Sequence, residues 1–211
     1  MSQLNQLRNR GVISALDRVI VWAILFVSVL AGLFGLVRGG VIVSSEVASG
    51  EISLALIANQ PLPAKADIGT PRIVAGSYAT ADVTVSGLSF GVSSLAIATQ
   101  IVNTLTQAAI AASIAFLAWR VLRARPFTRS LSLTVMFAGS ALLVGGLFSQ
   151  GFGSVAAAMA AGELNGPTAR GFWPLAGRID GTPLAFGVVL LLVGVAFEYG
   201  ERLQRDTEGL V

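Results

Sequence analysis

The chain has 211 residues, a formal net charge of +3, and neither cysteine nor histidine. The missing side chains exclude disulfides, thiolate nucleophiles, histidine general bases and metal sites built on Cys or His. Hydrophobic residues make up 54% of the chain and charged residues only 12%. This composition is typical of a membrane protein, because a soluble domain of this length needs more polar surface.

Four long apolar stretches divide the chain, and each predicts a transmembrane helix. Apolar runs of this length suit the hydrocarbon core of a bilayer, which is roughly 30 Å thick. The predicted spans are 19–38, 93–122, 131–150 and 183–200.

The segment before the first span, residues 1–18, is predicted to be cytoplasmic. Its apolar residues Leu4, Leu7 and Val12 are spaced among polar ones, which fits either a short amphipathic helix on the inner leaflet or a frayed tail. A basic start followed by an apolar run also resembles a secretory signal. The run is longer than the apolar region of a signal, so we expect an uncleaved anchor.

The segment 39–92 has the composition of a folded loop and not of a linker. Polar and apolar residues alternate at the start of 51–57 and throughout 82–86, and such alternation predicts β-strands. Prolines and glycines between them mark turns. We therefore expect an all-α membrane protein, a four-transmembrane-helix bundle, with a small extracytoplasmic β-subdomain.

The second span carries the best candidate for an internal functional feature. Gln100, Asn103 and Gln107 are spaced so that they share one helix face. Amides without partners are costly in hydrocarbon, so we expect this stripe to face the bundle interior and not lipid. It either fixes the bundle through interhelical hydrogen bonds or lines a polar binding cavity.

The third span, 131–150, leads into the predicted extracytoplasmic loop 151–182. The alanine-rich run 155–161 either continues the third helix or forms a separate surface helix. A continuous helix through this run would be about 46 Å long, more than the hydrocarbon core needs, so we expect a break or kink near Gly151. Residues 171–175 are a candidate further strand of the β-subdomain.

The fourth span, 183–200, begins with a proline, which suits the first turn of a helix. The helical pattern continues into the predicted cytoplasmic tail, 201–211. Glu198 lies four residues before Arg202, and Glu201 lies four residues before Arg205. This spacing is typical of ion pairs on a helix surface, which explain the two glutamates better than acid–base chemistry does.

The arginines indicate how the spans are oriented. The larger group flanks the predicted inner ends of the helices and the cytoplasmic link 123–130: Arg8, Arg10, Arg18, Arg120, Arg123, Arg125, Arg129, Arg202 and Arg205. The other basic residues are spread over the two longer segments on the opposite side. Because Lys and Arg near span ends stay in the cytoplasm, we expect both termini there, with anionic lipid headgroups as counter-charge.

Two short motifs give the chain a resemblance to a known family. The link contains Arg125-Pro-Phe-Thr-Arg129, and the tail reads Glu201-Arg-Leu-Gln-Arg-Asp-Thr-Glu-Gly-Leu-Val211. Together with four spans and a β-rich first outer loop, they resemble the bacterial integral membrane family called domain of unknown function 2975. The resemblance implies a membrane protein that restrains or signals to a DNA-binding partner, such as a small helix-turn-helix regulator. It implies no catalytic residues.

We therefore predict a non-catalytic protein of the bacterial inner membrane, a regulatory or signalling component that acts through a cytoplasmic partner. The alternative is an accessory subunit that packs against a larger membrane protein complex. Spans without charged residues at their centres disfavour small-solute transport. We expect no cofactor, no metal and no direct contact with nucleic acid. The expected partner contacts are Arg123, Arg125, Arg129, Asp206 and Glu208.

Overall fold

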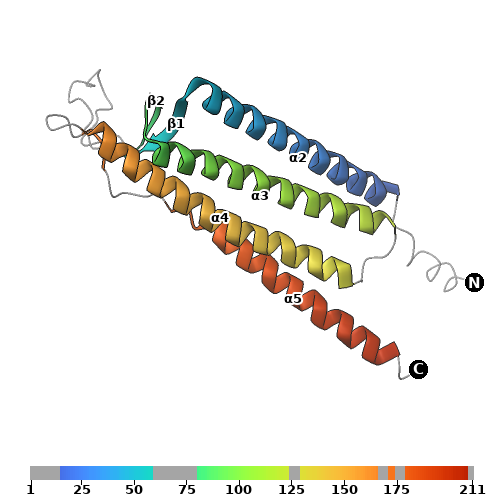
Figure 1. The fold of residues 1–211 in the computed structure, drawn as a ribbon. Coiled ribbons are helices and arrows are strands. Elements are labelled where there is room, and N and C mark those ends of the chain that lie inside the picture. The colour runs from blue at the N-terminus through green and yellow to red at the C-terminus, as the bar shows by residue number, and fades with distance from the viewer. Residues whose placement is uncertain (1–14, 59–79, 124–128, 166–170, 174–178, 209–211) are drawn as a thin grey trace, which may run out of the picture. The chain divides into compact units, whose positions relative to one another are not determined.

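The protein is mostly helical in a computed structural model, which describes residues 15–58, 80–123, 129–165, 171–173 and 179–208 (Figure 1). Short connections join α2 to β1 and β2 to α3, whereas residues 57–80 lie between the two strands. The elements are helix α2 (Ala15–Ser49), strands β1 (Glu51–Leu56) and β2 (Ala81–Ser86), and helices α3 (Phe90–Leu122), α4 (Arg129–Leu164) and α5 (Thr182–Glu208).

The chain forms two compact units, and each of the four helices contributes residues to both. The first unit consists of Met1–Leu36, Thr106–Leu143 and Ala185–Val211. The second unit consists of Val37–Leu105 and Val144–Leu184, and it includes both strands.

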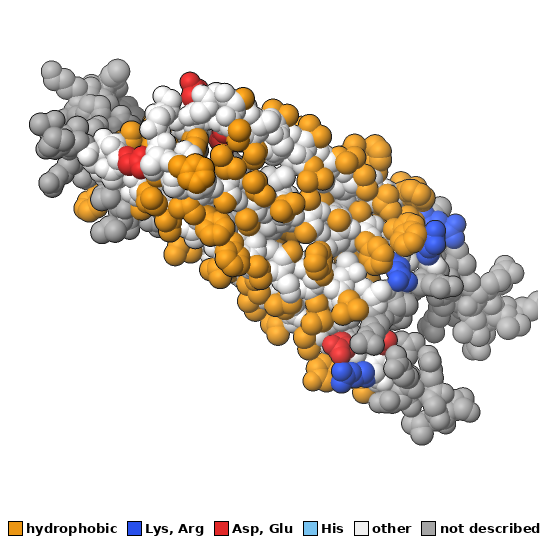
Figure 2. All heavy atoms as spheres, in the orientation of Figure 1, with side chains coloured by type: hydrophobic (Ala, Val, Ile, Leu, Met, Phe, Trp, Pro, Cys, Tyr) orange, Lys and Arg blue, Asp and Glu red, His pale blue; other side chains and the backbone are white. Residues whose placement is uncertain are grey.

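In the described part of the chain, all four helices are long and apolar enough to cross a membrane. Large apolar side chains cover their outer faces, as Figure 2 shows, and Phe34 and Leu192 are examples with about two thirds of their surface exposed. A surface of this kind is unfavourable in water and favourable in lipid, where a helix also satisfies all its backbone hydrogen bonds internally. The helices therefore fit a multi-pass membrane protein, as the apolar runs predicted.

The predicted pair of antiparallel strands is confirmed. Glu51 of β1 lies opposite Ser86 of β2, and Leu56 lies opposite Ala81. The chain turns into β1 at Gly50, whose φ of 67° lies in the left-handed region that glycine adopts without a steric penalty. Of the candidate strand at 171–175, Phe172 forms an isolated antiparallel bridge with Ala58, and residues 174–175 lie outside the described residues.

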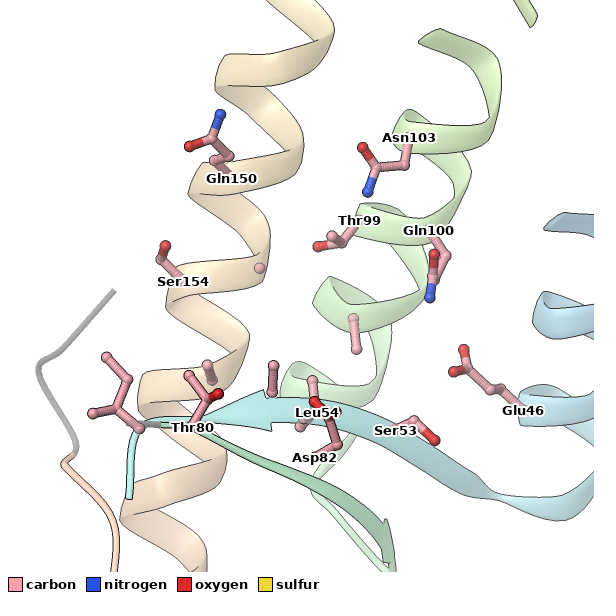
Figure 3. Close-up of a pocket in the computed structure, with 15 residues that line it drawn as sticks. Glu46, Ser53, Leu54, Thr80, Asp82, Thr99, Gln100, Asn103, Gln150 and Ser154 are labelled. Atoms are coloured by element: carbon pink, nitrogen blue, oxygen red, sulfur yellow. The ribbon is translucent and has the colours of Figure 1, made fainter. Parts of the chain in front are cut away.

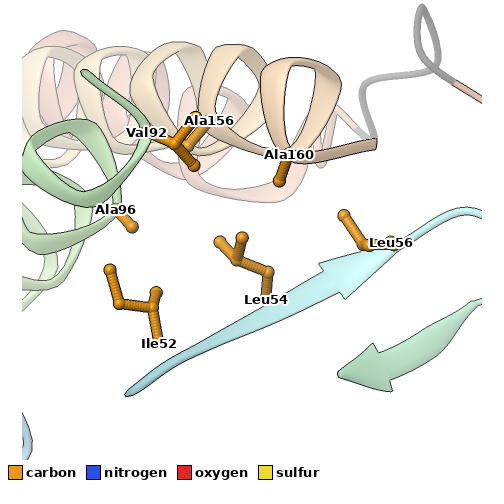
Figure 4. Close-up of a cluster of buried hydrophobic side chains, with 7 residues drawn as sticks. All are labelled: Ile52, Leu54, Leu56, Val92, Ala96, Ala156 and Ala160. Carbon is orange, nitrogen blue, oxygen red and sulfur yellow. The ribbon is translucent and has the colours of Figure 1, made fainter. Parts of the chain in front are cut away.

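The core of the second unit lies between the hairpin and two helices (Figure 4). Strand β1 alternates between exposed and buried residues, so one face is entirely apolar. A two-stranded hairpin is marginally stable alone, and here α3 and α4 supply the rest of its core. Their contributions are mostly alanines, which allow the strand to approach closely. The buried cluster is Ile52, Leu54, Leu56, Val92, Ala96, Ala156 and Ala160.

The expected helix break near Gly151 is wrong. Helix α4 is continuous over 36 residues, or about 54 Å, so the alanine-rich run continues the third helix. Glycine inside a helix costs about 1 kcal/mol relative to alanine, and burial of Ala156 and Ala160 against the hairpin offsets that cost. Helix α2 likewise continues to Ser49, so the first residues of the segment 39–92 are helical.

In the first unit, α4 and α5 pack closely through small residues. A Cβ atom placed on Gly139 would lie 2.9 Å from the backbone oxygen of Gly187. Further along the same pair, the buried hydroxyl of Ser132 donates a 2.8 Å hydrogen bond to the backbone oxygen of Gly194. Close backbone approach and interhelical hydrogen bonds are the forces that hold helices together in lipid.

Candidate functional site

A polar cavity of about 480 Å³ lies within the second unit (Figure 3). Its volume is in the range of small-molecule binding sites. The end of α2, both strands, α3 and α4 all contribute to its lining. Of the described residues that line it, none is Lys or Arg, and two are acids. The polar lining residues are Glu46, Ser53, Thr80, Asp82, Thr99, Gln100, Asn103, Gln150 and Ser154.

Glu46 is the most deeply buried polar residue of this cavity. It lies in the last turn of α2, where the Gly50 N–H donates a 3.0 Å hydrogen bond to its backbone oxygen. Only 8% of the residue is exposed, and Oε2 has no hydrogen-bond partner among the described residues. The backbone N–H of Ser53 donates to the carboxyl group. Figure 3 shows this carboxyl group on the side of the Gln100 amide.

Helix α3 forms the next wall with Thr99, Gln100 and Asn103. The Thr99 hydroxyl donates to the backbone oxygen of Leu95 at 2.9 Å and keeps its lone pairs as acceptors. In the described part of the chain, neither side-chain amide forms a hydrogen bond. Figure 3 shows Asn103 and Thr99 directed toward α4, whereas Gln100 is directed toward Glu46.

Helix α4 forms the opposite wall, and its amide is engaged within the protein. Gln150 donates from Nε2 to the backbone oxygen of Asp180 at 2.9 Å. Its Oε1 accepts from the Asp180 N–H at 2.6 Å. Further along α4, Asn165 makes the same two-bond contact with the backbone of Phe172, at 2.8 Å and 3.2 Å. Gln150 therefore supports the wall and is not free to bind a ligand.

The three amides of the predicted stripe lie in two different units of the structure. Gln100 and Asn103 line the cavity, whereas Gln107 belongs to the first unit. There the Oε1 atom of Gln107 would lie 3.6 Å from a Cβ atom on Gly35, so this amide lies against α2. Gln100 and Asn103 are thus at the cavity and Gln107 is not, and the choice between cavity lining and interhelical hydrogen bonding stays a prediction.

The predicted partner contacts are only partly described. The Arg123 guanidinium stacks 4.0 Å above the centre of the Trp119 ring at the end of α3. Arg125 lies outside the described residues. Arg129 belongs to α4, and Asp206 and Glu208 to α5, but their side chains lie outside the described part.

The expected surface pair on α5 is confirmed. Arg202 and Glu198 form an ion pair with a 2.6 Å distance between Nη2 and Oε1. Both side chains are largely exposed, and such i, i+4 pairs contribute only a few tenths of a kcal/mol to helix stability, roughly 0.3–0.5. The pair is thus ordinary surface electrostatics.

The chemistry of the cavity is that of recognition by hydrogen bonds and charge. Carboxyl oxygens, amides and hydroxyls line it next to the apolar side chains of Leu54 and Ile57. Within the described residues, no three His, Cys, Asp or Glu side chains are grouped so that they could hold a metal ion.

Sequence reasoning missed the two residues that define the cavity, Glu46 and Gln150. Glu46 was assigned to a loop because the apolar run ends before it, yet α2 continues to Ser49. Gln150 is the last residue of the predicted third span, and the sequence analysis gives it no functional role. Glu46 lies about two helical turns after Arg38, the last residue of the predicted first span. Extending that helix over 39–49 would have placed Glu46 on α2.

Comparison of the chain with protein-family models, curated proteins and solved structures gave no match. The resemblance to the family called domain of unknown function 2975 therefore stays a prediction. The class of the protein rests on its own features: four helices able to span a membrane, with a β-hairpin packed on two of them.

Proposed function

We propose that the chain is a non-catalytic regulatory or signalling component of a bacterial inner membrane, with a ligand-sensing cavity and a cytoplasmic protein partner. The observation that carries the proposal is the cavity of the second unit. Its lining combines the carboxyl group of Glu46, whose buried Oε2 atom has no hydrogen-bond partner among the described residues, with the amides of Gln100 and Asn103. A few convergent polar groups beside apolar side chains are typical of a site that binds a small molecule.

The cavity is suited to sensing because three helices line it. Glu46 comes from α2, Gln100 from α3 and Ser154 from α4. A ligand that contacts several helices binds one of their arrangements more tightly than another. Only such a difference in affinity shifts a conformational equilibrium, so a site shared by several helices is where binding can be converted into a signal.

The proposed orientation has both termini and the link 123–130 in the cytoplasm and the hairpin outside. The end of α3 supports this orientation, because Trp119 and Arg123 form a stacked pair there. Tryptophan anchors a helix at the membrane interface, and arginine next to a span is retained on the cytoplasmic side.

The proposed partner contact lies on the cytoplasmic end of α5. Tyr199 and Leu203 are four residues apart on one helix face, and each is about two thirds exposed. The acids Asp206 and Glu208 follow them, and the arginines of the link supply opposite charge. The family resemblance makes a small helix-turn-helix regulator the candidate partner.

Affinity purification in mild detergent, followed by mass spectrometry, tests this function. The full chain is compared with a variant that lacks residues 206–211 and with a full-length variant that carries Asp206→Asn and Glu208→Gln. All four apolar runs precede the deletion, so both variants should insert into the membrane, and both should lose the partner.

Two results would contradict the proposal. If both variants keep every protein captured by the full chain, the tail is not a contact site. If all three chains co-purify with the same large membrane complex, the protein is an accessory subunit.

A further inference from the structure

We propose that the cavity of the second unit binds a small organic cation, a primary amine that also carries hydroxyl groups. The inference rests on the proposed function, since it names the class of ligand that the sensing cavity takes. It follows from the charge of the lining, from the hydrogen-bonding groups that have no partner among the described residues, and from the size of the cavity.

The charge of the lining selects a cation. Glu46 is more than nine-tenths buried, its Oε2 atom has no partner among the described residues, and Figure 3 shows its carboxyl group at the cavity. Asp82 adds a second acid to the lining, and no lining residue in the described part is basic. A buried carboxylate is stable only when it is paired and hydrogen-bonded. An ammonium group supplies both a positive charge and N–H donors.

The neutral groups of the lining define the rest of the ligand. The amides of Gln100 and Asn103 each offer donors and an acceptor, and the Thr99 oxygen offers a further acceptor. Gln150 is not counted among the ligand contacts, because both its amide nitrogen and its amide oxygen form hydrogen bonds with Asp180. Hydroxyl groups both donate and accept, so a hydroxylated amine can pair with the carboxyl group and the α3 amides together.

The size of the cavity and the side chains that line it argue against an inorganic ion as the ligand. The cavity volume of about 480 Å³ is that of an organic ligand site. Ca²⁺ takes six to eight oxygen ligands at about 2.3–2.6 Å, and Mg²⁺ demands near-octahedral geometry. No group of three acidic, His or Cys side chains in the described residues meets that need.

Calorimetric titration of the full-length chain in lipid nanodiscs tests the proposal with matched probes. Glucosamine and glucose differ by one amine in place of a hydroxyl, and ethanolamine provides an amine with a single hydroxyl. We expect glucosamine to bind at least tenfold more tightly than glucose. Glu46→Gln should weaken glucosamine binding at least tenfold. The control Glu51→Gln changes an exposed acid close in sequence that does not line the cavity, and it should bind as the wild type does.

A second variant keeps the test decisive if Glu46→Gln is unstable. Asn103→Ala removes one free amide without changing charge, and it should weaken glucosamine more than ethanolamine. Melting temperatures without ligand establish whether each variant is folded. Equal binding of glucose and glucosamine, or unchanged binding in both Glu46→Gln and Asn103→Ala, would overturn the proposal.

Two other results would also overturn it. The first is that Na⁺ or Mg²⁺ alone stabilises the wild type and competes with the amine, which would make the site an inorganic one. The second is that amines bind only after Lys65→Gln and Arg72→Gln, two basic residues of the segment 59–79 outside the described residues. In that case one of these side chains, and not a ligand, neutralises Glu46. If the wild-type chain binds none of the amines but still captures its tail-dependent partner, this inference is refuted and the proposed function stands.

Discussion

The side-chain amide of Gln150 forms two hydrogen bonds with the backbone of Asp180, which lies two residues before α5. It donates to the Asp180 oxygen at 2.9 Å and accepts from the Asp180 N–H at 2.6 Å. The Asp180 carboxyl group in turn accepts a 2.9 Å hydrogen bond from the Thr182 N–H at the start of α5. One amide on α4 thus holds the chain where the last helix begins.

This contact predicts that the amides around the cavity differ in their effect on stability. Gln150→Leu removes two hydrogen bonds and should lower the free energy of unfolding by about 1–3 kcal/mol. Gln100→Leu removes an amide with no partner among the described residues, so its effect should be close to zero or stabilising. Thermal unfolding in detergent measures both. Equal destabilisation by the two variants would mean that the Asp180 contact does not support the fold.

The close packing of α4 against α5 predicts that the effect of a Gly→Ala substitution on stability depends strongly on its position along α4. Gly139→Ala would place a methyl group 2.9 Å from a backbone oxygen of α5, so it should destabilise the protein by about 1–3 kcal/mol. Gly151→Ala on the same helix meets no atom within 4 Å and should be neutral or stabilising by up to about 1 kcal/mol. Melting temperatures of the two variants in one detergent compare them directly. A destabilising Gly151→Ala would argue that α4 is broken there.

The packing of the hairpin on the helices predicts a large cost for truncating its core. Leu56 is 1% exposed, and Leu56→Ala should cost about 2–5 kcal/mol. Leu147 of α4 is 62% exposed, so Leu147→Ala removes a side chain that makes few protein contacts and should cost much less. Protease accessibility of the hairpin, together with melting curves, would report the difference. If Leu56→Ala leaves both unchanged, the hairpin is not packed on α3 and α4 as described.

The arginine distribution predicts the topology, and the absence of native cysteine makes it testable. Arg125→Cys in the link should react with a membrane-impermeant maleimide only after the membrane is permeabilised. Glu51→Cys, on the exposed face of β1, should react in intact spheroplasts. Labelling with the opposite pattern would invert the proposed orientation.

Much of the fold follows from local pattern. In lipid a backbone must satisfy its own hydrogen bonds, so long apolar runs form helices, and the four runs appear as α2, α3, α4 and α5. The alternation over 51–57 and 82–86 places apolar residues on one face, and β1 and β2 form there. Neither inference needs knowledge of a distant contact.

The lengths of the helices and the cavity depend on contacts that the sequence does not display. Helix α4 passes through Gly151 because Ala156 and Ala160 pack against the distant strand β1. The same long-range packing brings Glu46, Gln100 and Gln150 around one cavity. The amide stripe on α3 is visible as a helical spacing, but its division between a cavity and a helix contact depends on which neighbour each amide meets. Local chemistry thus determined the elements, and only the packing of helices against the hairpin decided where the cavity forms.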